Sequence, residues 1–399
     1  MLYRLYRLRL PRMTIPQTED GYPRFSDAEM ARRRSAIEAL MEEHDARHLV
    51  LYGANRFGSA VGWITGWPVT REAAVVVTPG ERDVVLVQFH NHVPNARRLA
   101  RDAEVRWGGP STIATVVEII EARGGGDSTI GFAGPLTAGQ RDALAASFVR
   151  AVDLGGPVAD LRLIKSAEEL EWIRVGAELS DRSIEALRRE VVPGRTEHEL
   201  AAIVEGAYLA QGAVNHIHYF GVTSMLDPGR AVPAQYPSSR RLREDDVLVT
   251  EISASFWDHP GQVLRTFTIA SDPTPLYREL HDVAETAFES ILRVVRDGVH
   301  VTEATEAASV IEEAGFTTYD DLVHGFVGGY LPPVLGSKSR ALETPPDMTF
   351  RAGMTVVVQP NVITPDERAG VQTGELVHVT HDGIERLHHA PPGLARIGG

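Results

Sequence analysis

Among the residues in the second half of the sequence that can transfer protons, three histidines and one glutamate lie in segments that favour a role in a site. His216 and His218 lie two residues apart in the segment VNHIHYFG, so on a regular strand their side chains share one face. Glu251 lies in the apolar strand VLVTEISASF, where burial would raise the pKa of its carboxyl group. His324 precedes a glycine-rich segment, in which a ligand can approach the backbone closely. These residues predict general acid–base chemistry, which needs groups that titrate near neutrality.

The sequence leaves a structural interpretation open for each of these residues. His216 and His218 could both be structural or surface residues, or only one of them could be catalytic. Glu251 could form a salt bridge with Arg265 instead of acting as an acid or base.

Other residues could bind a substrate beside these groups. The amides of Gln262 and Gln359 donate and accept hydrogen bonds, which suits the orientation of a substrate better than proton transfer. Arg340, in the loop LGSKSR, could bind a substrate carboxylate or could be an ordinary surface charge. Tyr330, in GGYLPPV, could line a small pocket or pack in the core.

The elements that must position these residues form two predicted domains. Residues 26–160 alternate short strands and helices, as in an α/β domain, with EAAVVVTPGERDVVLVQF as two strands around a Pro-Gly turn. Residues 161–399 open with a long helix, for which Ser166 and Glu169 form a capping-box pattern. The order helix, helix, strand, strand then occurs twice, which could arise by chance. It could also mark a pseudo-two-fold domain whose central site draws residues from both halves.

Composition limits the possible partners and chemistry. A chain of 399 residues is long enough for two domains with substantial cores. The net charge of −14, without a basic stripe, argues against a nucleic-acid partner. The absence of cysteine excludes disulfides, thiolate catalysis and Cys-ligated metal sites.

The N-terminal segment is predicted to be a flexible arm over residues 1–25. It alternates Leu and Tyr with Arg and lacks the continuous apolar core of a secretory signal. No run approaches the ~18 apolar residues of a membrane span. We therefore expect a cytoplasmic protein without a membrane partner.

Five segments, in order, resemble the pita-bread family, which includes methionine aminopeptidase, aminopeptidase P, prolidase and creatinase. They are IKSAEELEWIR, PGRTEHELA, LRTF, GMTVVVQP and GVQTGELVHVT. The resemblance covers nearly the whole chain and implies an α+β fold, in which a creatinase-type N-terminal α/β domain precedes a pseudo-two-fold pita-bread domain. It also implies a homodimer in which part of the N-terminal domain reaches the partner's active site. The candidate residues there are Asn55, Arg56, Trp63, Trp67 and Arg71.

Metal-binding members of this family supply two Asp, one His and two Glu to a pair of divalent metals. The matching positions here are Glu251, Gln262, His324, Gln359 and Gly374. Two-metal hydrolysis needs carboxylates that bridge the ions, and both bridging positions are lost. The sequence therefore predicts no dinuclear metal centre and no other cofactor, and leaves open whether one metal ion binds weakly. Glu375 follows the lost ligand by one residue, on the opposite face of a regular strand, and is a candidate substrate-binding residue.

The resemblance to creatinase and ectoine hydrolase, members that act without metal, implies a hydrolase. The predicted reaction is cleavage of a C–N bond in a small polar or zwitterionic compound, with His and Glu as acid and base. The Glu positions of creatinase correspond to Leu264 and Gln359, so its mechanism does not transfer directly. A lyase or isomerase, or a non-catalytic binding protein, remains an alternative, and a metal-dependent Xaa-Pro peptidase is disfavoured.

Overall fold

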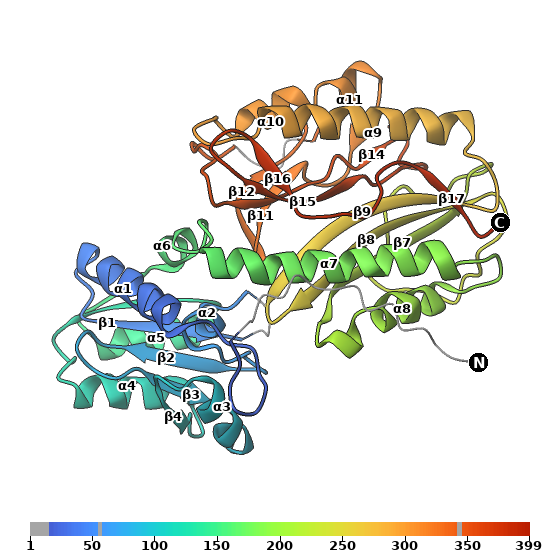
Figure 1. The fold of residues 1–399 in the computed structure, drawn as a ribbon. Coiled ribbons are helices and arrows are strands. Elements are labelled where there is room, and N and C mark those ends of the chain that lie inside the picture. Colours follow the sequence, from blue (N-terminus) through green and yellow to red (C-terminus); the bar gives the residue numbers. More distant parts are fainter. Residues whose placement is uncertain (1–15, 55–57, 341–344) are drawn as a thin grey trace. The chain divides into compact units, whose positions relative to one another are not determined.

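The computed structural model describes residues 16–54, 58–340 and 345–399 (Figure 1). The chain divides into two compact units, Met1–Val158 and Ala159–Gly399. Most of the predicted N-terminal arm, residues 1–15, lies outside the described residues. In its described part, Gln17 pairs with Pro23, and the guanidinium of Arg33 lies 3.9 Å from the ring centroid of buried Phe25.

The first unit is built on a mixed sheet with the strand order β4-β3-β2-β1-β5-β6. Its strands are β1 (His48–Gly53), β2 (Ala73–Val77), β3 (Val84–Val87), β4 (Glu104–Trp107), β5 (Thr129–Ala133) and β6 (Arg150–Asp153). Its helices are α1 (Asp27–Glu43), α2 (Ala60–Thr65), η1 (His90–His92), α3 (Val93–Leu99), α4 (Thr112–Ala122), α5 (Ala138–Ser147) and α6 (Gly155–Asp160). Apolar residues of α4 and α5 cover one face of the sheet, and α1 lies on the other side (Figure 1). This arrangement confirms the α/β prediction.

The second unit contains a larger sheet, whose main path runs β12-β11-β13-β15-β9-β8-β7. Its members are β7 (Val214–Ser224), β8 (Asp246–Phe256), β9 (His259–Ile269), β11 (Val323–Phe326), β12 (Tyr330–Leu335), β13 (Thr355–Val358) and β15 (Gly374–Val379). Two short strands pair with members of this path: β16 (Ile384–Arg386) pairs with β15, and β17 (Ala395–Ile397) pairs with β9. Two others, β10 (Thr317–Thr318) and β14 (Val362–Ile363), pair separately. Neighbouring strands along the main path are antiparallel.

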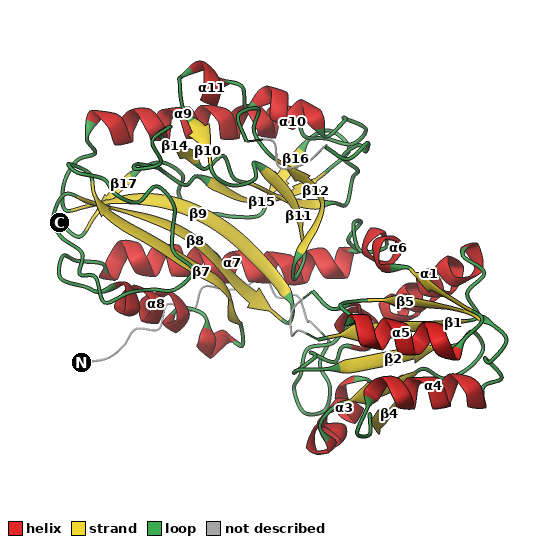
Figure 2. Cartoon of the chain, turned by 180° about the vertical axis from the view of Figure 1, so that it is seen from behind, coloured by secondary structure: helices red, strands yellow, loops and turns green. Residues whose placement is uncertain are grey.

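Helices cover both sides of this sheet (Figure 2). They are α7 (Ala167–Glu190), α8 (Glu197–Gly206), η2 (Leu209–Gln211), α9 (Pro275–Val294), α10 (Thr302–Ala307) and α11 (Val310–Glu313). The capping box expected at Ser166 is present at the start of α7, and a second capping box, at Thr196, starts α8. Glycine allows α7 to lie directly against β9, because a Cβ on Gly261 would be 2.2 Å from the Cα of Ala177.

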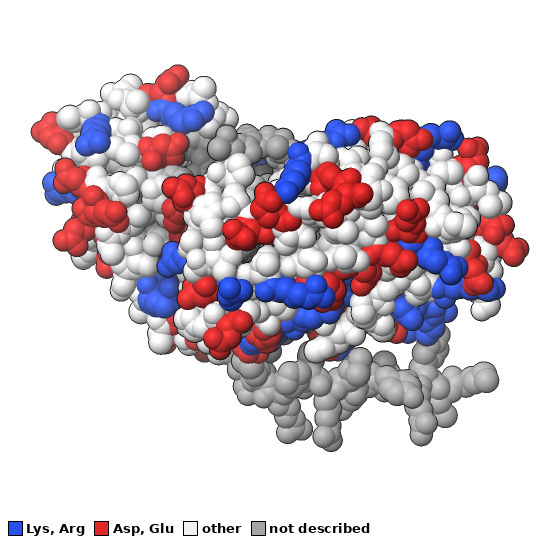
Figure 3. Space-filling view, turned by 90° about the horizontal axis from the view of Figure 1, so that it is seen from above, with Lys and Arg blue, Asp and Glu red and all other residues white. Residues whose placement is uncertain are grey.

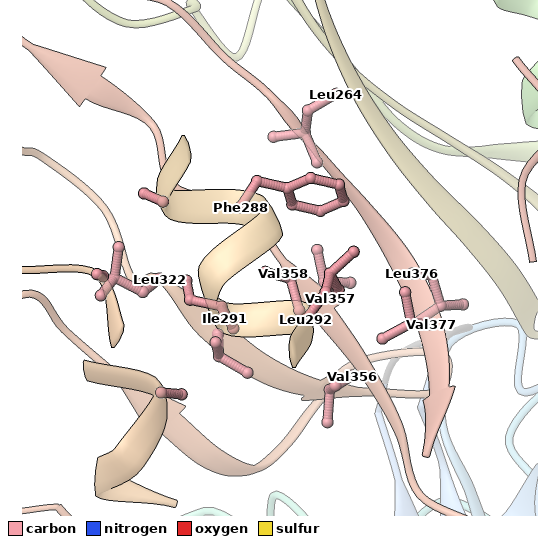
Figure 4. Close-up of a cluster of buried hydrophobic side chains, with 14 of the residues drawn as sticks. Leu264, Phe288, Ile291, Leu292, Leu322, Val356, Val357, Val358, Leu376 and Val377 are labelled. Atoms are coloured by element: carbon pink, nitrogen blue, oxygen red, sulfur yellow. The ribbon is translucent and has the colours of Figure 1, made fainter. Parts of the chain in front are cut away.

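Two hydrophobic cores hold the central strands in place. One lies between α7, α8 and the long hairpin strands β7, β8 and β9. In the other, Phe288, Ile291 and Leu292 of α9 pack against the valines of β13 and Leu376 of β15 (Figure 4). Burial at both faces fixes the register of β8, β9, β11 and β13. The polar side chains on these strands are therefore held at defined positions.

The described part of the chain contains no helix that is long and apolar enough to cross a membrane. Figure 3 shows acidic and basic side chains interspersed over the face in view. The expectation that the chain binds no nucleic acid stays a prediction.

Candidate functional site

The centre of the candidate site is a hydrogen-bonded row of three side chains on the large sheet. Glu251 lies on β8, and Gln262 lies on β9, opposite Ser253, so the two side chains are diagonal neighbours on one face. Gln359 follows directly after β13. The Nε2 atom of Gln262 donates to Oε1 of Glu251 at 2.9 Å and to Oε1 of Gln359 at 3.0 Å. All three residues are buried, so the strands hold this row rigidly.

Glu251 is held in its neutral form near neutral pH. Burial raises the pKa of its carboxyl group to about 8, and the negative charges of Asp320 and Asp321 add to the effect. The side chain of Gln372 opposes the shift but does not cancel it. Glu251 can therefore act as a proton donor at neutral pH.

Asp320 and Asp321 are site residues that the sequence analysis missed. They lie just before β11 and act on each other, because burial and the neighbouring Asp321 raise the pKa of Asp320 to about 7. Asp321 is 3% exposed, and the hydroxyl of Tyr330 donates to its Oδ1 at 3.3 Å. The available sequence signal was an adjacent acidic pair three residues before His324, which could equally have belonged to a surface loop.

His324 supplies the site with a neutral imidazole. It lies on β11, fully buried, and the ring of Tyr330 stacks on it with 4.0 Å between centroids. Its Nδ1 lies 3.2 Å from the carbonyl oxygen of Gly325, which can only accept, so Nδ1 carries the proton. Burial lowers the pKa of His324 to about 4, although Gly325, Asp320 and Gln359 oppose the shift. Within the described residues, Nε2 has no hydrogen-bond partner and is free to accept a proton.

The two histidines of β7 do not share one face, contrary to the sequence expectation. An irregularity of the strand between Asn215 and Ile217 breaks the alternation of side chains at His216. The ring of His216 contacts Phe326, which also contacts His324. His216 therefore lies on the same side of the sheet as the candidate site.

His218 instead stacks on Phe220, which belongs to the core under α7 and α8. Its Nδ1 is 3.0 Å from Oε1 of Glu205, although this contact lacks hydrogen-bond geometry. Of the two candidates, only His216 is near the acid–base groups.

Two predicted substrate-binding residues are engaged elsewhere. Glu375 lies on the face of β15 opposite the site and is fully buried, where it accepts from Arg265 at 2.9 Å and from Arg386 at 2.6 Å. Arg265 therefore pairs with Glu375 and not with Glu251. Arg340 is a partly exposed loop residue that pairs with Glu367, in line with its interpretation as a surface charge.

The candidates from the N-terminal domain lie in the first unit. Trp67 is buried beside His92, Trp63 packs against Arg33, and Arg71 is exposed. Asn55 and Arg56 lie outside the described residues. A contribution of these residues to an active site stays a prediction.

The side chains present do not fit a dinuclear metal centre. One carboxyl and one imidazole remain at the five matching positions, and Gln262 directs its amide N–H groups, which cannot bind a cation, at Glu251 and Gln359. A side chain at Gly374 has no room, because its Cβ would be 2.4 Å from the carbonyl oxygen of Val358. Over the described ranges, no group of three or more His, Asp or Glu could hold a metal ion.

Buried polar atoms gather around this row without partners among the residues that the structure describes. They are Oε1 of Gln262, Nε2 of Gln359, Nε2 of His324, Oε1 of Gln372 and Oδ2 of Asp321. Buried polar groups are normally hydrogen-bonded, because leaving one unpaired costs about 1–3 kcal/mol. The site is therefore suited to a small polar ligand.

Residues 171–381 match the model of metallopeptidase family M24, and the chain belongs to this family. It is 25% identical over 231 residues to the Xaa-Pro dipeptidase of Pyrococcus furiosus, a match that covers 58% of this chain and 64% of that protein. It is 29% identical over 258 residues to the probable dipeptidase PepE of Mycobacterium tuberculosis, covering 63% and 65%. The sequence matches thus span slightly less than two thirds of these relatives.

Solved structures of low sequence identity share the fold of nearly the whole chain. The dipeptidase PepE of Mycobacterium ulcerans has a TM-score of 0.78 at 23% identity and covers 94% of this chain and 99% of its own. Prolidase from Pyrococcus furiosus has a TM-score of 0.73 at 21% identity, covering 88% and 99%. These likenesses confirm the predicted pita-bread fold with its preceding N-terminal domain.

Proposed function

We propose that this protein is a metal-independent hydrolase that cleaves a C–N bond in a small polar compound. The observation that carries the proposal is the row of Glu251, Gln262 and Gln359, in which amides occupy positions where metal-binding relatives place carboxylates. The names of the relatives support hydrolysis of a C–N bond, because a dipeptidase cleaves a peptide bond. The homodimer and the cytoplasmic location remain predictions.

The two groups proposed to transfer protons, His324 and Glu251, have complementary protonation states. At neutral pH the His324 imidazole is neutral with a free Nε2, and the Glu251 carboxyl is protonated. His324 then takes a proton from water as the water oxygen bonds to the substrate carbon, and Glu251 gives its proton to the departing nitrogen. The products are a carbonyl compound and an amine, and the reaction consumes one water.

The amides keep the substrate in place during this exchange. Gln262 presents a free acceptor and Gln359 a free donor, neither of which has a partner in the described part of the chain. A substrate with one donor and one acceptor, such as an amide or urea group, satisfies both. Neutral amides bind such a group without competing for the transferred protons.

Turnover of a substrate panel by His324→Ala tests this assignment. Small amides, ureas, guanidines and Xaa-Pro dipeptides would be incubated with the protein, and released amine or ammonia would be measured. Loss of a general base lowers kcat by about 10²–10⁴-fold, so we expect His324→Ala to lose that much while its thermal unfolding stays cooperative. His381→Ala, at an exposed position, is the matched control.

Full activity of His324→Ala would refute the proposed base. Products of elimination or isomerisation, without uptake of oxygen from H₂¹⁸O, would identify a lyase or isomerase instead. Binding of panel compounds without any turnover would identify a binding protein.

A further inference from the structure

The acidic pair before β11 has unused hydrogen-bonding capacity beside the proposed catalytic groups. Asp321 is almost fully buried, its Oδ1 accepts from Tyr330, and its carboxyl group interacts with that of Asp320, whereas no donor among the described residues reaches its Oδ2. Asp320 acts electrostatically on both Glu251 and His324, so the pair belongs to the same site. The proposed reaction uses neither aspartate.

Several free polar atoms of the site are acceptors. Oε1 of Gln262, Oε1 of Gln372, Oδ2 of Asp321 and Nε2 of His324 can accept, whereas Nε2 of Gln359 can donate and the hydroxyl of Ser253, opposite Gln262, can do either; each lacks a partner in the described ranges. N–H groups on a ligand satisfy the acceptors. A cluster of acceptors with two acidic side chains also favours positive charge on that ligand.

Tyr330 gives this acidic pair an aromatic neighbour. One face of its ring stacks on His324, its hydroxyl bonds to Asp321, and the residue is still 53% exposed. Its remaining ring surface is therefore accessible from solvent next to a carboxylate. Aromatic faces attract planar cations, with about 0.5–2 kcal/mol per contact.

We propose that Asp320, Asp321 and Tyr330 bind a cationic nitrogen group of the substrate, of the guanidinium or amidinium class. A planar group of this kind offers paired N–H donors that match a carboxylate. A metal ion is not the cation meant, because no three His, Asp or Glu in the described residues are arranged to hold one. The proposal rests on the proposed function, since it takes this site as the substrate site.

Calorimetric titration of the full chain with methylguanidinium chloride and with N-methylurea tests the proposal. The two probes have the same shape and differ in charge, and sodium chloride would keep the ionic strength equal. A hydrogen bond to a charged group is worth about 1.5–3 kcal/mol, so we expect methylguanidinium to bind at least about tenfold more tightly. Titrations in buffers of different ionisation enthalpy should show proton release, because the cation draws a proton from the carboxyl pair.

Variants separate this subsite from general attraction by a negatively charged protein. Asp321→Asn should weaken methylguanidinium about tenfold and leave N-methylurea unchanged. Asp382→Asn, which removes an exposed acid, should change neither probe. Equal binding of both probes by the unmodified protein would overturn the proposal, whether or not Asp321→Asn folds. So would unchanged methylguanidinium binding by a folded Asp321→Asn.

Failure of the subsite proposal and failure of the hydrolase proposal give different experimental results. Cation-selective binding without turnover of any panel compound would contradict hydrolysis and leave the subsite standing. Turnover of neutral amides together with no preference for methylguanidinium would support the hydrolase and refute the subsite.

Discussion

The Nε2 atom of Gln262 lies 2.9 Å from Oε1 of Glu251, so the group facing the buried carboxyl is a hydrogen-bond donor. The same nitrogen donates to Gln359 at 3.0 Å, which joins β8, β9 and the end of β13 through one amide. A carboxylate at position 262 could bind the same metal ion as Glu251, whereas the amide of Gln262 can only orient the Glu251 carboxyl group through a hydrogen bond. This arrangement supports the proposed proton transfer.

Replacing Gln262 by Leu should remove this organisation. The change leaves Oε1 of Glu251 and Oε1 of Gln359 without their donor in a buried place. Each unpaired group costs about 1–3 kcal/mol, so we expect the free energy of unfolding to fall by about 2 kcal/mol, measured by urea denaturation. Gln235→Leu, at an exposed position, should change it by less than about 0.5 kcal/mol. Equal stability of the two variants would show that the Gln262 contacts are unimportant.

Gly374 should not accept even a methyl group. A Cβ there would lie 2.4 Å from the carbonyl oxygen of Val358 and 2.8 Å from the Cα of Gln359. Overpacking of this kind costs about 1–3 kcal/mol, so Gly374→Ala should lower the thermal midpoint by several degrees. Gly383→Ala is the control, because an added Cβ there meets open space. A Gly374→Ala variant as stable as Gly383→Ala would mean that the strands can separate to admit a side chain.

The pH profile of kcat/KM should have two limbs. His324 must be neutral to accept a proton, so activity rises as pH passes its lowered pKa of about 4. Glu251 must be protonated to donate, so activity falls as pH passes its raised pKa of about 8. The groups acting on Glu251 are Asp320 and Asp321, which raise its pKa, and Gln372, which lowers it.

The Asp320→Asn variant tests whether deprotonation of Glu251 causes the loss of activity at alkaline pH. Removing this negative charge lowers the pKa of Glu251, so the alkaline limb should move to lower pH. The acid limb should stay in place, because Asp320, whose pKa is raised to about 7, is itself protonated and uncharged near pH 4. Asp382→Asn should leave both limbs in place. An alkaline limb that does not respond to Asp320→Asn would assign it to another group.

Local sequence signals predicted most of the elements correctly. Ser166 and Thr196 cap helices because their side chains accept from the third residue of the helix, a purely local interaction. Residues 302–313 form the two short helices α10 and α11, with a break at Ala308 and Ser309. The sequence contains no Gly or Pro at this break, and we find no local cause for it.

The site was harder to predict because it depends on contacts between distant strands. Gln262 and Gln359 were identified, but their shared hydrogen bond requires the register of three strands. His218 was misplaced because a strand irregularity at His216 leaves no clear mark in the sequence. Asp320 was missed because its electrostatic effect on Glu251 arises only when the fold brings two segments that are distant in the sequence near each other.

The central claim is that amides have replaced metal chemistry in this member of the family. Its most direct test is a calorimetric titration of the chelator-treated, full-length protein with Mn²⁺, followed by turnover measurements on the same samples. The account predicts no saturable binding of two equivalents and equal turnover of the substrate before chelation, after it and with added Mn²⁺. Binding of two Mn²⁺ per chain, with turnover that appears only when they are bound, would contradict it.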